Sequence, residues 1–167
     1  MPADSAPRSI LVDRELHRGM ITDGTLYAVT RPLAILAYTT LLAAFIINII
    51  VLTIIGDSGS DRASTLAWTP LAIAALIVAS IMFTRSSVAR AITTAMPAGT
   101  TVSASLDEDG IQLAAKRGRS VMVYSTFRAM RVGKHAVLLQ LRGDSAITAV
   151  PRALLSDSDI ALLRSKI

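Results

Sequence analysis

The chain has 167 residues, a length that leaves room for one small folded domain beside any membrane-spanning part. It contains no cysteine, which excludes disulfide bonds, thiolate metal sites and cysteine nucleophiles. Hydrophobic residues make up 52% of the chain and the formal net charge is +5. The basic surplus lies after residue 84, where twelve Lys and Arg stand against six Asp and Glu.

Residues 1–31 form a mixed N-terminal segment before the first long apolar run. Residues 9–12 predict a short strand, and Asp13 is placed to cap a helix that begins at Arg14. Gly19 and Gly24 lower the helical propensity of that stretch.

Two apolar runs, 32–55 and 66–84, dominate the chain and contain no Asp, Glu, His, Lys or Arg. A bilayer core needs about 20 apolar helical residues, so both runs predict membrane spans, joined by a short polar link at 56–65. A cleaved signal peptide would begin near residue 1 and have a shorter apolar core of about 7–15 residues. The sequence therefore predicts a retained transmembrane hairpin over 32–84.

The placement of arginine sets the expected orientation. Arg31 precedes the first run, and Arg85 and Arg90 follow the second, whereas the link offers Arg62 beside two aspartates. Basic flanks stay on the cytoplasmic side. We therefore expect a multi-pass protein of the cytoplasmic (inner) membrane with both termini in the cytoplasm.

Few polar residues lie inside the predicted spans, and none is a carboxylate, histidine, lysine or arginine of the kind that ion pathways use. Asn48 has two interpretations: it lines a ligand site, or it makes an interhelical hydrogen bond. Ala72, Ala75 and Ala79 recur at helical spacing and would let another helix approach closely. That helix is the first span, a second copy of the chain or a foreign subunit.

After the second span the pattern changes from helical to alternating. Residues 85–99 predict a helix extension and a linker that ends at Pro97 and Gly99. Between 101 and 150, short alternating stretches separated by polar turns predict six antiparallel strands. Val123, Leu139 and Ile147 are expected to point inwards and Gln140 outwards.

The C-terminal residues predict a helix. Ser156 and Asp159 fit a capping box, and Ile160, Leu163 and Ile167 share one face. A bent sheet followed by one terminal helix is a pleckstrin-homology-like (PH-like) arrangement over 100–167. The predicted fold class is therefore α+β: a transmembrane hairpin followed by a small antiparallel, PH-like β domain with a C-terminal helix.

The order of two close spans, a cytoplasmic sheet and a terminal helix resembles the YcxB-like bacterial membrane protein family over residues 10–167. Three local patterns carry the resemblance: Asp109-Gly110-Ile111, then Tyr124 with Phe127 and Met130, and Val150-Pro151-Arg152 before Ala153-Leu154-Leu155. Tyr124 stands where that family commonly has tryptophan. The resemblance implies a fold and a membrane location, and it implies no activity.

Basic residues near the predicted membrane surface are candidates for contact with anionic lipid or a partner. The alternative interpretation is a solvated face that keeps the domain soluble. The candidates are Arg85, Arg90, Lys116, Arg117 and Arg119.

No catalytic, metal-binding or cofactor-binding motif is apparent in the sequence. His17 and His135 have no second ligand at a metal-binding spacing. Aromatic residues are 4% of the chain, too few for the stacking surface of a typical single-stranded nucleic-acid binder. We therefore expect a non-enzyme with no metal, no cofactor and no nucleic-acid partner.

The sequence is compatible with two functions, of which we predict the first and keep the second as the alternative. In the first, the protein is an accessory subunit of a larger bacterial membrane complex of respiratory, transport or envelope-assembly type. Its partners are then other integral membrane proteins or further copies of itself. In the second, it is a membrane-tethered sensor or scaffold whose cytoplasmic domain binds an acidic lipid, a peptide or a small ligand.

Overall fold

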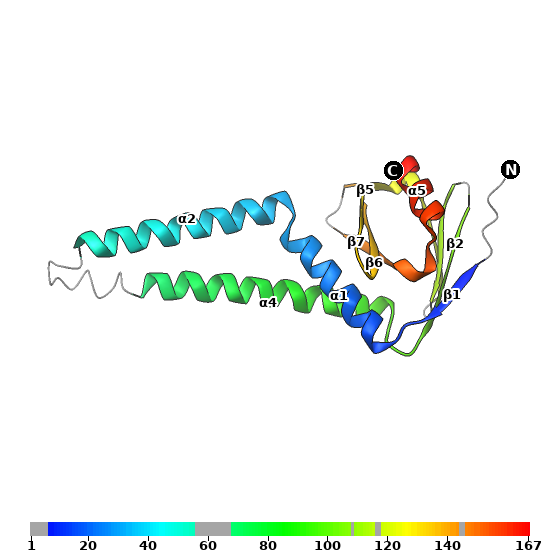
Figure 1. The fold of residues 1–167 in the computed structure, drawn as a ribbon, viewed down its shortest axis with the longest axis horizontal. Coiled ribbons are helices and arrows are strands. Elements are labelled where there is room, and N and C mark those ends of the chain that lie inside the picture. The colour runs from blue at the N-terminus through cyan, green and yellow to red at the C-terminus, as the bar shows by residue number, and fades with distance from the viewer. Residues whose placement is uncertain (1–6, 56–67, 108, 116–117, 144–145) are drawn as a thin grey trace. The chain divides into compact units, whose positions relative to one another are not determined.

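A computed structural model describes residues 7–55, 68–107, 109–115, 118–143 and 146–167. The chain is an α+β protein with two long apolar helices, two antiparallel sheets and a C-terminal helix (Figure 1). It divides into two compact units. One is the helical hairpin, Leu26–Ser86, and the other is the β domain, made of Met1–Thr25 together with Ser87–Ile167.

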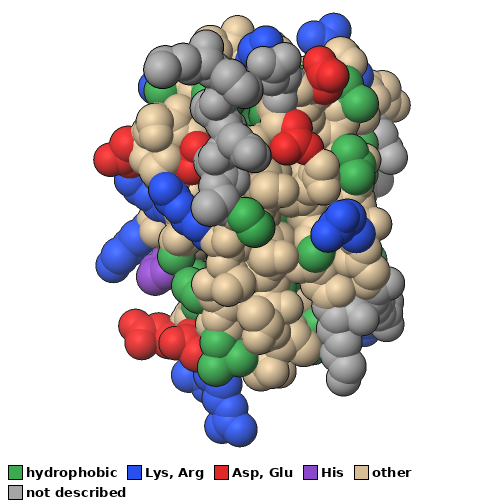
Figure 2. Space-filling model, turned by 90° about the vertical axis from the view of Figure 1, so that its right-hand side faces the viewer, with side chains coloured by type: hydrophobic (Ala, Val, Ile, Leu, Met, Phe, Trp, Pro, Cys, Tyr) green, Lys and Arg blue, Asp and Glu red, His purple; other side chains and the backbone are tan. Residues whose placement is uncertain are grey.

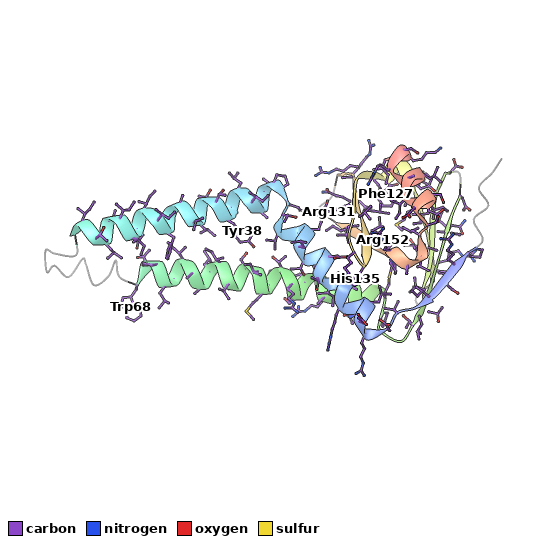
Figure 3. All side chains as sticks on the ribbon, in the orientation of Figure 1. Tyr38, Trp68, Phe127, Arg131, His135 and Arg152 are labelled. Carbon is purple, nitrogen blue, oxygen red and sulfur yellow. The ribbon has the colours of Figure 1, made fainter. Side chains whose placement is uncertain are left out.

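Helices α2 (Pro32–Ile55) and α4 (Thr69–Ala95) lie side by side in the hairpin (Figure 1). The predicted helix over 32–55 is confirmed, and α4 continues past Arg85 as predicted. Residues 66 and 67 lie outside the described residues. Tyr38 points from α2 towards α4, and its hydroxyl lies 3.4 Å from Ser80 Oγ (Figure 3).

The N-terminal segment belongs to the β domain. Strand β1 (Arg8–Leu11) pairs antiparallel with β2 (Thr101–Leu106), so that Ile10 lies opposite Val102. The predicted strand is confirmed. The predicted domain boundaries at residues 31 and 100 differ from the division in the structure, because backbone hydrogen bonds join β1 to β2 although the hairpin separates these strands in the sequence.

Helix α1 (Arg14–Val29) begins where the sequence predicts. The carboxylate Oδ1 of Asp13 accepts a hydrogen bond of 2.7 Å from the backbone N–H of Leu16. An acceptor at this position satisfies one of the unpaired N–H groups of the first turn. The predicted cap is therefore confirmed.

The first sheet has the order β1-β2-β3-β4, with β3 at Gly110–Ala115 and β4 at Gly118–Val123. The second has the order β5-β6-β7, with β5 at Phe127–Val132, β6 at Ala136–Leu141 and β7 at Ile147–Pro151. The six predicted strands are present, divided between two sheets by a 3-10 turn, η2 (Tyr124–Thr126).

The C-terminal segment packs as the sequence predicts. After a second 3-10 turn, η3 (Arg152–Leu154), helix α5 runs over Asp157–Lys166. The predicted capping box is confirmed, since Ser156 Oγ accepts from the Asp159 N–H and the Asp159 carboxylate accepts from the Ser156 N–H. Arg8 Nη1 of β1 lies 3.6 Å from the same carboxylate and ties the first strand to α5.

Two of the predicted side-chain orientations are wrong. Val123, expected inside, is 49% exposed, and Gln140, expected outside, is only 7% exposed. Val123 ends the edge strand β4, whereas Gln140 lies on β6, which β5 and β7 flank on both sides. Leu139 is fully buried as predicted, and Ile147 is half-buried.

Tyr124 joins the η2 turn to the β2–β3 turn. Its hydroxyl donates a hydrogen bond of 2.8 Å to the backbone carbonyl of Asp107, and its side chain is buried. Burial, with a smaller contribution from the carboxylate of Asp107, raises the pKa of Tyr124 above its ordinary value. The neutral phenol is therefore favoured in the folded state.

We expect this tyrosine to make the β domain sensitive to alkali. A pKa that is higher in the folded state gives stability that is present below the unfolded value of about 10 and is lost as the pH rises through the folded pKa. The thermal unfolding midpoint of Tyr124→Phe should be lower than that of the natural chain at pH 8, since one hydrogen bond is gone. It should then fall less steeply than that of the natural chain towards pH 11. Circular dichroism measures both midpoints, and an equal decline of the two would contradict this prediction.

Candidate functional site

A cavity of about 390 Å³ opens between the two sheets of the β domain. Its walls come from β3 and β4 of the first sheet, from β7 of the second, and from helical residues of α1 and the end of α4. The volume falls in the range of about 300–1,000 Å³ that is typical of small-molecule sites. It is the main candidate for a binding site in the part of the chain that the structure describes.

The cavity exists because the two sheets do not close on each other. Strands β4 and β7 are each the last strand of a sheet, and no pairing among the described residues joins them. They approach through side chains, with Thr148 Oγ1 3.8 Å from Met122 Sδ. Small residues line several walls and leave the space unfilled: Ala91 and Ala95 of α4, Ala115 of β3 and Ala149 of β7.

The lining is mostly apolar and flexible. Three of the six methionines of the chain line it: Met20, Met96 and Met122. Methionine is unbranched and adapts to irregular shapes. Ser120 and Thr148 supply the side-chain hydroxyl groups of the lining, and this set of described residues includes no aromatic ring and no acidic side chain.

Arg119 is the ionisable residue among those that line the cavity, but its side chain belongs to the outer face of the sheet. Ser120 lies opposite the buried Leu113 in the β3–β4 pairing and so points inwards. Arg119 is the next residue along and lies opposite Ala114. Because successive side chains of a strand alternate between faces, the guanidinium of Arg119 points away from the core.

Helix α1 is held against the second sheet by a short polar contact that fixes the position of Met20. Oδ2 of Asp23 accepts hydrogen bonds from the backbone N–H of His135, at 2.7 Å, and of Ala136, at 3.0 Å. Gly19 lies against the His135 ring so closely that a Cβ at this position would overlap the ring. Met20 lies between Gly19 and Asp23 in the sequence and is fully buried in the wall of the cavity.

The cavity is open to solvent on one side, since Ala91, Ala95 and Ser120 of its lining are exposed. Its mostly apolar wall is therefore in part in contact with water. Covering apolar surface gains about 25 cal/mol per Å², so an apolar ligand suits this lining.

The predicted basic residues are dispersed over several elements. Arg85 and Arg90 are exposed on α4, and Arg119 is exposed on β4. Lys116 and Arg117 lie outside the described residues. Basic and acidic side chains are interspersed on the face of the β domain that Figure 2 shows. Contact of these arginines with anionic lipid stays a prediction.

The predicted helix-packing residues divide into two groups. Asn48 is half-buried, and its Oδ1 atom is buried and has no hydrogen-bond partner among the described residues. Ala72, Ala75 and Ala79 are all exposed on α4, off the side marked by the half-buried Ile73 and Ile77.

Sequence reasoning missed the cavity. Its lining joins Met20, the end of α4 and two edge strands, which are far apart in the chain.

Among the described residues, no group of three or more His, Asp or Glu side chains is placed to hold a metal ion.

Comparisons with protein-family models, with curated proteins and with solved structures find no match to this chain. The resemblance to the YcxB-like family stays a prediction.

Proposed function

We propose that this chain is a non-catalytic integral membrane protein whose hairpin crosses the cytoplasmic membrane twice and whose β domain is a PH-like binding module. Exposure of apolar side chains all around α2 and α4 carries the membrane part of this proposal. Leu33 is 80% exposed, and Ile54 and Phe83 are each 73% exposed. Water tolerates an apolar surface of this extent poorly, whereas lipid solvates it.

Several further features support this arrangement. Two antiparallel sheets followed by a terminal helix agree with a PH-like fold. Trp68 is 70% exposed beside the start of α4 and points away from it (Figure 3), which suits the interfacial level of a bilayer. Arg31, Arg85 and Arg90 favour a cytoplasmic location for both ends of the hairpin.

The proposed topology predicts a clear labelling result. The natural chain has no cysteine, so a single cysteine reports one position. Gly59→Cys, in the link, should react with an impermeant maleimide on intact cells, and Ala161→Cys, on the exposed face of α5, should react only after lysis. Labelling of Ala161→Cys on intact cells and not of Gly59→Cys would overturn the orientation.

The cavity favours the sensor or scaffold interpretation over a purely structural role. An apolar space of about 390 Å³ is large enough for a small ligand, and it lies in a domain whose other central side chains are buried. Purification of the tagged full chain in a polymer-bounded lipid disc, followed by mass spectrometry of the extract, tests this function. A co-purifying small molecule at a constant ratio to protein supports the binding module, and its absence counts against it.

The exposed alanines favour a second candidate, the accessory subunit. Ala72, Ala75 and Ala79 are available to a helix from another membrane protein or from a second copy. The same purification separates the two candidates. A stoichiometric large membrane complex supports the accessory subunit, and a particle that contains this chain alone supports the self-contained binding module.

A further inference from the structure

We propose that the β-domain cavity binds an aliphatic chain, either the tail of a free fatty acid or an acyl chain of a membrane lipid. This inference rests on the proposed role as a binding module and names the chemistry of its ligand. The cavity, of about 390 Å³, is the site, and its alkyl and thioether lining is the recognising surface.

The kind of side chain in the lining favours a flexible ligand over a rigid ring. Met20, Met96 and Met122 can change rotamer to follow a bent hydrocarbon chain. The alanines of the lining offer only methyl groups. No described aromatic side chain of the lining offers a flat surface for stacking. A planar cofactor or base would therefore gain little here beyond burial.

The polar groups of the lining favour a ligand whose buried part is uncharged. Ser120 and Thr148 can each hydrogen-bond a single polar atom, and the guanidinium of Arg119 belongs to the opposite face of β4. A buried charge without a partner is strongly unfavourable. The charged end of the ligand must therefore stay outside the cavity.

The wall at Gly118 is where such a head group can remain in solvent. Gly118 lines the cavity and begins β4, and a Cβ placed on it would meet no atom within 4 Å. Its φ of +132° is a conformation that glycine adopts readily. Arg119 follows directly on the outer face of β4 and is exposed, so a charged head group that emerges at Gly118 lies in solvent.

Methionine methyl groups provide a direct test in the full chain. The protein, labelled with ¹³C at the methionine methyls, would be placed in lipid nanodiscs and titrated with stearate that carries a nitroxide near its tail end. The signals of Met20, Met96 and Met122 should broaden saturably. Met130, which is half-buried on β5 and does not line the cavity, should broaden less and serves as the internal reference.

A second titration identifies the source of the aliphatic ligand. Phosphatidylcholine with the same nitroxide replaces the fatty acid as the probe. Broadening by the phospholipid assigns the site to membrane lipid, and broadening by stearate alone assigns it to free fatty acid. Broadening of no cavity methionine by either probe, or equal broadening of Met130, overturns the proposal.

Adjacent alanines on β3 give a matched pair of variants. Ala115→Leu fills the cavity, and Ala114→Leu adds the same atoms on the outer face. The apparent affinity for the probe should fall about tenfold or more in the first and stay within about twofold in the second. Ala95→Leu, on α4, is a second filling variant in case Ala115→Leu does not fold, as judged by the Met130 signal.

Failure of this inference is distinct from failure of the proposed function. A co-purified small molecule without an aliphatic chain, together with silent cavity methionines, leaves the binding module standing and overturns the aliphatic ligand. Equal loss of probe affinity in Ala114→Leu and Ala115→Leu also overturns it, because the cavity would then not be the site.

Discussion

Replacement of Phe127 by alanine should lower the free energy of unfolding of the β domain by about 3–5 kcal/mol. Phe127 is the largest of the fully buried side chains and lies at the start of β5 inside the domain (Figure 3). Its removal leaves a cavity that the closely packed side chains around it cannot fill. The readout is the exchange protection of the β6 amides in the full chain, because protection in a central strand reports the larger opening reactions.

The control for Phe127→Ala is Val123→Ala. The alternating pattern of the sequence predicts that Val123 points inwards, but it is 49% exposed in the structure. Its truncation should change the free energy of unfolding by about 0.5 kcal/mol at most, as for other exposed positions. Equal losses for Phe127→Ala and Val123→Ala would show that the register of β4 is wrong.

Replacement of Asp23 by alanine should destabilise the β domain by about 3 kcal/mol. The Asp23 carboxylate accepts hydrogen bonds from the backbone N–H groups of His135 and Ala136, and its removal leaves both donors unpaired in a part-buried turn. Hydrogen bonds to a charged group contribute about 1.5–3 kcal/mol each. The loss should appear as reduced exchange protection at the β5–β6 turn and a shift of the Met20 methyl signal.

Asp13→Ala is the matched control on the same helix. Asp13 caps α1 through the Leu16 N–H in an exposed position, so its loss should cost about 1 kcal/mol and leave Met20 unaffected. Asp23→Asn keeps one acceptor oxygen and should fall between the two. An Asp23→Ala variant no less stable than Asp13→Ala would mean that the contact between α1 and the β5–β6 turn does not hold the helix in place.

Local features of this protein are readable from the sequence. The limits of α2 follow from an unbroken apolar run between polar neighbours, and the caps at Asp13 and Ser156 follow from side chains that satisfy N–H groups two or three residues away. The strands of the β domain follow from alternation interrupted by polar turns. Each of these signals lies within a few residues, where backbone geometry leaves few alternatives.

Features that depend on distant contacts are decided only by the tertiary structure. Membership of β1 in the first sheet requires pairing across the whole hairpin, and the burial of Gln140 requires a neighbouring strand on each side of β6. Alternation tells which residues share a face but not which face is covered, so the orientation of Val123 could not be predicted.

The cavity is the clearest case of a feature without a sequence signal. Met20 and Ile92 read as ordinary apolar positions of two helices, and Ala115 and Ala149 as ordinary small residues of two strands. They line one space because Asp23 holds α1 against the second sheet while the edge strands β4 and β7 stay apart. The sequence by itself determines the apolar helices, the caps and most strands, since these depend on near neighbours. The cavity depends on how separate elements pack, which only the folded chain decides.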